Sequence, residues 1–264
     1  MARNEYIPFL SEIKEVRQQT NIESTFRMAF KGAVKPGQFF EVSIPKYGEA
    51  PISVSGIGPD YVDLTIRSVG RVTNEIFNRH QGDPLFLRGP YGNGFDVEKY
   101  LGKELIIVAG GTGMAPVKGV VDYFMAHLEK LKGFTLIAGF KSPANMLFKK
   151  ELKNWQTKGN VLLTVDQADE TYEGHLGLVT DFIPKLAIQA VTDVQVIVVG
   201  PPMMMHFTVQ EFLKRQVRED HIWISQERKM CCGIGKCGHC KIDNVYICLE
   251  GPVFNYQKGK HLID

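Results

Sequence analysis

The chain has 264 residues, a formal net charge of +2, 44% hydrophobic residues and 23% charged residues. These values exclude a disordered chain, allow two domains of ordinary size, and make nucleic acid a poor expected partner. No apolar run approaches 18 residues and the first residues lack the apolar core of a signal peptide, so the sequence predicts a cytoplasmic protein with no membrane span.

The first part of the chain, residues 1–101, is predicted to be β-structure. Short β-rich runs are separated by Gly, Pro and Asp, which is typical of a small antiparallel barrel or sandwich. A single helical segment at 72–80 interrupts the pattern. The expected strands cover residues 25–30, 38–45, 50–56, 61–69 and 84–89.

This β-rich part contains polar groups suited to a pyrophosphate. Ser53 and Thr73 offer hydroxyls, Gly70 offers a backbone N–H, and Arg67 and Arg71 offer positive charge. The alternative interpretation is that each is a solvated turn or strand residue.

Residues 102–225 have a different rhythm. Five continuous apolar runs alternate with helical stretches, which predicts a five-stranded parallel sheet covered by helices on both faces. The first helix has an apolar stripe at steps of three and four, formed by Met114, Val117, Val121, Phe124, Leu128 and Leu131. The expected strands cover residues 105–109, 134–140, 161–165, 194–200 and 221–225.

Two glycine-rich turns follow the first and the fourth of these strands. Glycines at such turns let backbone N–H groups approach a phosphate, and ligands of open α/β sheets collect at the carboxyl ends of the strands. In the first turn Pro116 stands where a dinucleotide fingerprint has its third glycine, so the match is partial. Met205 is equally well explained as core filler. The predicted NAD-binding residues are Gly110, Gly111, Thr112, Gly113, Pro116, Gly200, Pro201, Met203 and Met204.

All five cysteines lie within residues 231–248, in the C-terminal segment 226–264. Cys232, Cys237, Cys240 and Cys248 have the spacing C-x4-C-x2-C-x7-C, and the first three match a plant-type [2Fe–2S] site. Zinc also takes four thiolates, but structural zinc sites usually have two C-x2-C pairs and this segment has one. The spacing therefore favours iron–sulfur, with Cys231 as a spare thiol.

In combination, "PISVS", "GPYGNGF", "GGTGMAP", "GPPMMM" and "CGIGKCGHC" resemble the ferredoxin–NADP reductase superfamily over essentially the whole chain. The nearest branch carries a C-terminal [2Fe–2S] cluster and serves anaerobic sulfite reductase, sulfhydrogenase and dihydroorotate dehydrogenase. "GEAPISVSG" and "TVDQADETYEGHLGLVT" look closest to the sulfite reductase member. The resemblance implies an N-terminal barrel that holds FAD, an NAD-binding α/β domain and a cluster segment. The implied FAD contacts are Pro51, Ile52, Ser53, Val54, Thr65, Ile66, Arg67, Gly70, Arg71, Val72 and Thr73.

The implied function is electron transfer: NADH is oxidised through FAD, and single electrons leave through the cluster to partner subunits that reduce sulfite to sulfide. A hydrogenase and a dihydroorotate dehydrogenase are the rival partners. One departure is Ala50, which occupies the position of the superfamily's FAD-phosphate arginine. It keeps open FMN or loose flavin binding, and also a zinc-stabilised binding module without redox activity. A free-standing reductase of a soluble acceptor is a further alternative. Lys141 and Ser142 could contact a 2′-phosphate, but the absence of an arginine there favours NADH over NADPH.

Overall fold

A computed structural model describes residues 4–170 and 172–262. They form two compact units, each discontinuous in sequence. Unit 1 comprises residues 4–95 and Glu227–Val253, and unit 2 comprises Asp96–Gln226 and residues 254–262. The three domains expected from the sequence stay a prediction, because compactness does not test independent folding.

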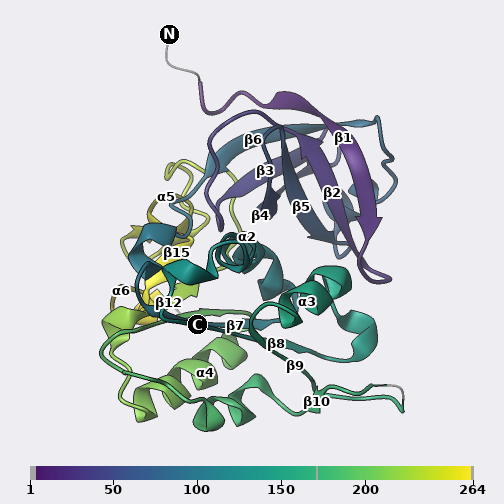
Figure 1. Ribbon diagram of the computed structural model, residues 1–264. Helices are drawn as coiled ribbons and strands as arrows, with labels where there is room; N and C mark the ends of the chain where they lie inside the picture. The colour runs from purple at the N-terminus through teal and green to yellow at the C-terminus, as the bar shows by residue number, and fades with distance from the viewer. Residues whose placement is uncertain (1–3, 171, 263–264) are drawn as a thin grey trace. The chain divides into compact units, whose positions relative to one another are not determined.

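Unit 1 is built on a closed six-stranded barrel in the order β1-β2-β5-β4-β3-β6, with every pair antiparallel (Figure 1). Alternate residues face the interior, where Phe26, Met28, Phe40 and Leu64 form part of a continuous apolar core. This confirms the predicted barrel. The strands are β1 (Phe9–Gln18), β2 (Glu23–Ala29), β3 (Phe39–Ile44), β4 (Gly48–Ile57), β5 (Tyr61–Arg67) and β6 (Pro84–Tyr91), with helix α1 (Arg71–Ile76) between the last two.

Strand β1 was not among the expected strands. Its sequence, FLSEIKEVRQ, carries several charged residues and only two residues of it are buried, so it lacks the β-rich run by which its neighbours were found. Pairing with β2 and β6 on its two sides nevertheless closes the barrel. The C-terminal part of unit 1 contains a short hairpin and a helix turn: β13 (Lys241–Ile242), β14 (Val245–Tyr246) and α5 (Ile247–Glu250).

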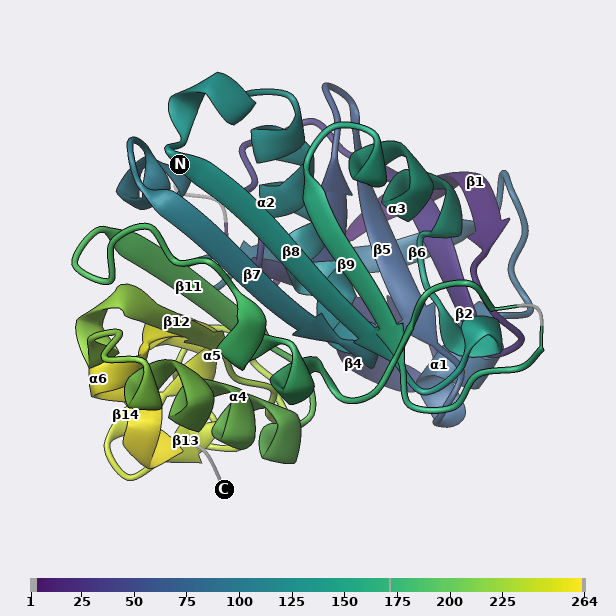
Figure 2. The same cartoon turned by 60° about the horizontal axis from the view of Figure 1, so that its bottom comes forward.

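Unit 2 contains a sheet of order β10-β9-β8-β7-β11-β12-β15. The five predicted strands are its centre, run parallel as Figure 2 shows, and are joined by two short edge strands that the sequence did not reveal. Strand β11 reads VQVIVV and is buried throughout, as expected of a strand covered on both faces. The strands are β7 (Glu104–Gly110), β8 (Gly133–Phe140), β9 (Asn160–Val165), β10 (His175–Leu176), β11 (Val194–Val199), β12 (Ile222–Ser225) and β15 (Val253–Asn255).

Helices cover both faces of this sheet, α2 and α3 on one and α4 on the other (Figure 1). The predicted stripe of α2 is buried at Met114, Val117, Val121 and Phe124, but the helix ends at Met125 because the backbone leaves the helical region at His127 (φ −143°). Within the described residues no helix has the length and apolarity that crossing a bilayer requires. The helices are α2 (Met114–Met125), α3 (Lys149–Gln156), α4 (Pro202–Lys214) and α6 (Tyr256–Gly259).

Candidate functional site

The two glycine-rich turns meet at one edge of the sheet in unit 2. The chain enters the sheet at β7 and continues outward through β8 and β9, then returns to the other side of β7 with β11 and β12. The direction of winding therefore reverses between β7 and β11. A crevice opens at the carboxyl ends of strands where an open α/β sheet reverses in this way. The turns after β7 and after β11 lie at this point.

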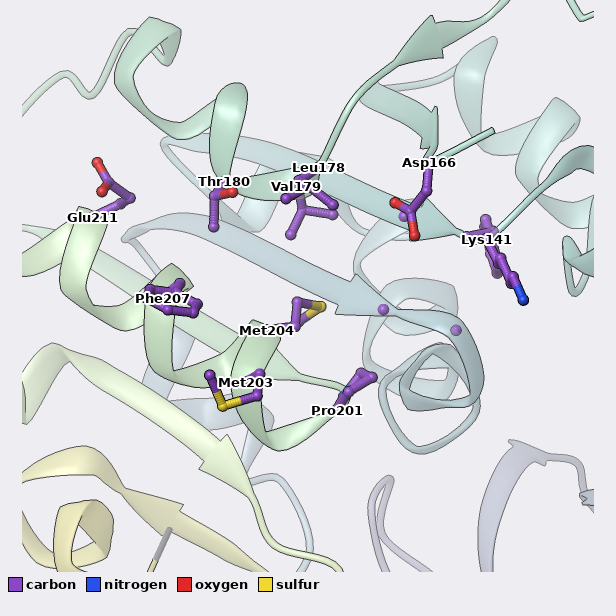
Figure 3. A pocket seen from close by; sticks show the side chains of 14 residues that line it. Lys141, Asp166, Leu178, Val179, Thr180, Pro201, Met203, Met204, Phe207 and Glu211 are labelled. Atoms are coloured by element: carbon purple, nitrogen blue, oxygen red, sulfur yellow. The ribbon is translucent and has the colours of Figure 1, made fainter. Parts of the chain in front are cut away.

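A cavity of about 560 Å³ lies there, a size suited to a small ligand (Figure 3). Its wall is mainly apolar: Met203 and Phe207 of α4 lie over it with more than half of each side chain exposed. Such a wall can pack against a flat aromatic ring system, while the few polar groups orient it. The lining residues are Gly110, Gly111, Gly139, Phe140, Lys141, Asp166, Leu178, Val179, Thr180, Pro201, Met203, Met204, Phe207 and Glu211.

One end of the cavity carries a charged pair. Lys141 follows β8 and Asp166 follows β9, and Figure 3 shows the two side chains at the same end of the pocket. Partial desolvation raises the pKa of the Asp166 carboxyl from its ordinary value, and the Lys141 ammonium opposes that rise. Asp166 follows the second strand from β7, with β8 between them. A carboxylate is the group that accepts hydrogen bonds from a ribose in dinucleotide sites.

Five of the nine predicted NAD residues line this cavity: Gly110, Gly111, Pro201, Met203 and Met204. Met205 is buried, in line with its interpretation as core filler. Asp166 and the segment Leu178–Thr180 were not among the predicted contacts. The position of Asp166 directly after a strand was a usable signal. Asp166 and Leu178–Thr180 also lie within residues 164–180, whose sequence resembles the sulfite reductase member.

Gly113 has a packing role instead. Its backbone is helical (φ −59°), but an added Cβ would lie 2.5 Å from the carbonyl oxygen and 2.7 Å from the carbonyl carbon of Val199. We expect Gly113→Ala to lower the free energy of unfolding by about 1–3 kcal/mol, because backbone atoms cannot move aside as a side chain can. Thermal unfolding measures this effect. Gly111→Ala is the matched control: it meets no atom within 4 Å and carries only the strain of φ +54°. An equal or larger loss in the control would contradict the packing role.

The four predicted ligands in unit 1 are organised as two pairs. The backbone N–H of Cys237 donates to Sγ of Cys232 over 3.5 Å, and that of Cys248 donates to Sγ of Cys240 over 3.4 Å. Cys232 interacts with Cys237 and Cys240 with Cys248, and Cys232 also acts on Cys248 across the two pairs. Among residues 4–170 and 172–262, no three His, Cys, Asp or Glu side chains are grouped so that they could hold one metal ion.

The loop between the cysteines is shaped to point backbone donors at sulfur. Gly235 (φ +68°) donates to Sγ of Cys248 over 3.3 Å, and Lys236 donates to Sγ of Cys232 over 3.3 Å. Burial raises the pKa of the Cys232 thiol, but such N–H groups outweigh it and lower that pKa to about 6. At Cys248 the balance is reversed, because burial and then the neighbouring Cys240 raise the pKa of its thiol. Four cysteine sulfurs, three of which accept backbone N–H groups, are the donor set that an iron–sulfur group takes. His239 is exposed, as expected of a loop residue.

The predicted flavin contacts lie on β4, β5 and at the start of α1. The side chains of Val54 and Ile66 belong to the barrel core, so only their backbone atoms can face a ligand. Ser53 is half-buried on β4, and Gly70 precedes α1 with open space beside its Cα. Hydroxyl, backbone N–H and cationic groups along one segment fit an anionic cofactor in charge and chemistry.

The two arginines near that segment already have partners within the protein. Arg67 pairs with the buried Glu23 at 2.6 Å, and Arg71 donates to the carbonyl oxygen of Lys46 over 2.7 Å. The Thr73 hydroxyl accepts from the backbone N–H of Gly70 and holds the turn into α1. Arg71 is the more available cation, because a carbonyl is a weaker partner than a buried carboxylate.

Two protein families match parts of the chain. The oxidoreductase NAD-binding domain matches residues 107–210, and the iron–sulfur cluster binding domain of dihydroorotate dehydrogenase B matches residues 227–258. The first contains both turns and every cavity-lining residue except Glu211, and the second contains all four paired cysteines.

Full-length relatives agree with this division. The gamma subunit of sulfhydrogenase 1 of Pyrococcus furiosus is 34% identical over 96% of this chain and 92% of its own length. The probable electron transfer subunit of dihydroorotate dehydrogenase B (NAD(+)) from the same organism is 32% identical over 96% and 91%. Among solved structures, that of an NADH-dependent reduced ferredoxin–NADP oxidoreductase superposes with a TM-score of 0.78 at 24% identity, over 97% of this chain and 90% of the other.

Proposed function

Because this chain belongs to the ferredoxin–NADP reductase-like family of electron-transfer subunits with a dihydroorotate dehydrogenase B-type iron–sulfur domain, we propose that it oxidises NADH and passes the electrons singly to a partner subunit. The family is one of oxidoreductases. The observation that carries the proposal is that one chain combines a nucleotide cavity at the reversal point of its sheet with two adjacent thiol pairs. Neither alone requires the other, whereas an electron relay requires both.

We propose the following residues for the parts of this relay. Bound flavin supplies the change from a two-electron hydride to single electrons, which a cluster carries onward. On unit 2 the turns at Gly110–Gly111 and Pro201–Met204 would hold NADH. On unit 1 the segment Arg67–Thr73 and Ser53 would hold FAD. Met203 and Phe207 would exclude water from the nicotinamide end through their apolar side chains.

A [2Fe–2S] cluster is the form that the thiols favour. Such a cluster takes two protein ligands on each of its two irons, which is the two-by-two arrangement of Cys232 with Cys237 and Cys240 with Cys248. Quantitative iron and sulfide analysis of the anaerobically purified chain tests the stoichiometry. Two irons and two sulfides per chain support it, and a single zinc would refute it.

NADH is proposed over NADPH because of Asp166. Its carboxylate would accept hydrogen bonds from an unmodified ribose and repel a 2′-phosphate. We expect Asp166→Ser to raise kcat/KM for NADPH relative to NADH by about 10- to 100-fold, the equivalent of roughly 1.4–2.7 kcal/mol. Steady-state kinetics with both nucleotides measure the ratio. Glu211→Gln, at another part of the same cavity, is the control and should leave the ratio unchanged. An unchanged ratio in Asp166→Ser would remove Asp166 from the specificity argument.

The partner is the least constrained part of the proposal. The two Pyrococcus furiosus relatives are subunits of a sulfhydrogenase and of dihydroorotate dehydrogenase B, which favours a hydrogen- or dihydroorotate-oxidising partner. The sulfite-reducing partner expected from the sequence is the second candidate, favoured by the resemblance of residues 48–56 and 164–180. Anaerobic purification of the native complex separates these, because the co-purifying subunits can be assayed for oxidation of hydrogen, oxidation of dihydroorotate and reduction of sulfite.

The test of the whole proposal is an anaerobic absorption spectrum of the isolated chain before and after NADH. We expect flavin and iron–sulfur bands that both bleach on addition of NADH. A colourless chain that contains zinc and no flavin would overturn the proposal in favour of a binding module without redox activity.

A further inference from the structure

Residues at the end of strand β6 form hydrogen bonds with both ends of the cysteine segment. The sequence RGPYGN, residues 88–93, begins within β6 and continues into the following turn. It contacts the chain before the first ligand through Arg88 and after the last ligand through Asn93. These contacts join residues 143 to 160 positions apart in sequence, all within unit 1.

Arg88 makes the first set of hydrogen bonds. Its Nη2 donates to the carbonyl oxygen of Cys231 over 2.7 Å, and its Nη1 donates to that of Cys232 over 3.1 Å. Glu49 holds the other side of the same guanidinium, at 2.8 Å and 3.2 Å from its oxygens to Nη2 and Nε. Arg88 is only 5% exposed, so its planar fork is fixed on both sides and presents two donors to successive carbonyls.

Asn93 makes the second set of hydrogen bonds. Its Nδ2 donates to the carbonyl oxygens of Glu250 and Val253, and its Oδ1 accepts from the N–H of Val253. Tyr91 lies between Arg88 and Asn93 in the sequence, and its ring packs on Gly233, where an added Cβ would lie 2.5 Å from the ring carbons. Side chains at the end of β6 therefore hold the cysteine loop at three places.

From this arrangement, and resting on the proposed cluster, we propose that Arg88 is a positioning residue for the iron–sulfur site. It fixes the backbone that presents Cys232 and places a buried positive charge beside that ligand. Hydrogen bonding, charge and burial around the sulfurs set the reduction potential of such a site, and the surrounding groups also set how firmly it holds metal. The charge stabilises the reduced, more negative state of the cluster, and the fork keeps the loop closed.

The test compares Arg88→Gln and Arg88→Lys with wild type in the full chain. Arg88→Gln loses the charge and the fork, so the midpoint potential of the cluster should become more negative and iron should be lost to a chelator about 10- to 100-fold faster. Arg88→Lys keeps the charge but not the fork, so its potential should stay near wild type while iron loss is still faster. Arg79→Gln is the control: Arg79 pairs with Glu75 in the same unit and does not touch the cysteine segment.

Each result decides. Potential and chelation rate equal to those of Arg79→Gln would overturn the positioning role, and a faster iron loss with unchanged potential in Arg88→Gln would overturn the role of the charge. If Arg88→Gln does not fold, the chelation rate of Arg88→Lys decides in its place. Neither measurement depends on NADH or a partner. A wild-type chain that binds no cluster would overturn the proposed function and this inference together, whereas a normal cluster in the variants overturns only the inference.

Discussion

Cys240→Ser is expected to abolish single-electron transfer and leave NADH oxidation in place. Cys240 is buried, and its sulfur receives the backbone N–H of Cys248 over 3.4 Å. A serine oxygen is a harder and less polarisable donor than thiolate, so the iron that this position would hold is lost. We expect the rate with a one-electron acceptor to fall at least about 100-fold. The rate with a two-electron acceptor of the flavin should change less than about threefold, because NADH would bind on unit 2 and flavin on other segments of unit 1.

Cys231→Ser is the matched control for that substitution. Cys231 adjoins the first ligand, but it is half-buried and belongs to neither thiol pair. Iron content and the visible spectrum should therefore match wild type. If Cys231→Ser loses the iron and Cys240→Ser keeps it, Cys231 is a ligand and Cys240 is not.

Glu41 gives the second large effect, a loss of stability with rising pH. This β3 residue is fully buried, and neither carboxyl oxygen has a hydrogen-bond partner among the described residues. Burial, and then the negative charge of Glu49, raise its pKa from 4.5 to about 8, although Arg88 opposes the rise. The folded state thus holds a proton that the unfolded state releases. Stability is fully present below about pH 4.5, falls between pH 4.5 and 8, and the loss is complete above pH 8.

The size of this effect is on the order of 5 kcal/mol, since each unit of pKa difference corresponds to about 1.4 kcal/mol. Glu41→Gln has no titrating group at this position. Between about pH 5 and 9 its thermal midpoint should therefore fall by several degrees less than the midpoint of wild type. Differential scanning calorimetry at a series of pH values measures how the thermal midpoint of each protein changes with pH. Glu12→Gln, an exposed carboxylate on β1, serves as the control and should keep the wild-type slope. Parallel curves for wild type and Glu41→Gln would show that Glu41 is ionised in the fold.

The sequence was informative wherever a local pattern carried the structure. Continuous apolar runs located the five central strands of unit 2, because a strand covered on both faces needs no polar residue. Strand β1 was not predicted, because its charged outward side chains obscure the alternation of apolar and polar residues. The cysteine spacing, likewise, is local, and the structure brings the four thiols into two pairs.

Contacts between distant segments could not be predicted in the same way. The bond from Arg88 to Cys231 spans 143 positions, and no pattern within either segment announces the other. Glu41 lies in an ordinary strand sequence, FFEVSI, where alternation would place it on the outer face of the barrel, yet it is completely buried. Leu178–Thr180 reaches the cavity only because a loop after β10 returns to the sheet. Each of these depends on the tertiary course of the chain.

The discontinuity of unit 1 also has a consequence for biosynthesis. Its barrel is complete in sequence at Phe95, but Glu227–Val253 emerge from the ribosome only after nearly all of unit 2 has been translated. Domains generally fold as they emerge, N-terminal first. For the time needed to synthesise the intervening segment, the nascent barrel exposes the side chains of Arg88, Tyr91 and Asn93 without the segment they hold. Loading of the proposed cluster would therefore be confined to the last moments of translation or to the released chain, when those side chains gain their partner.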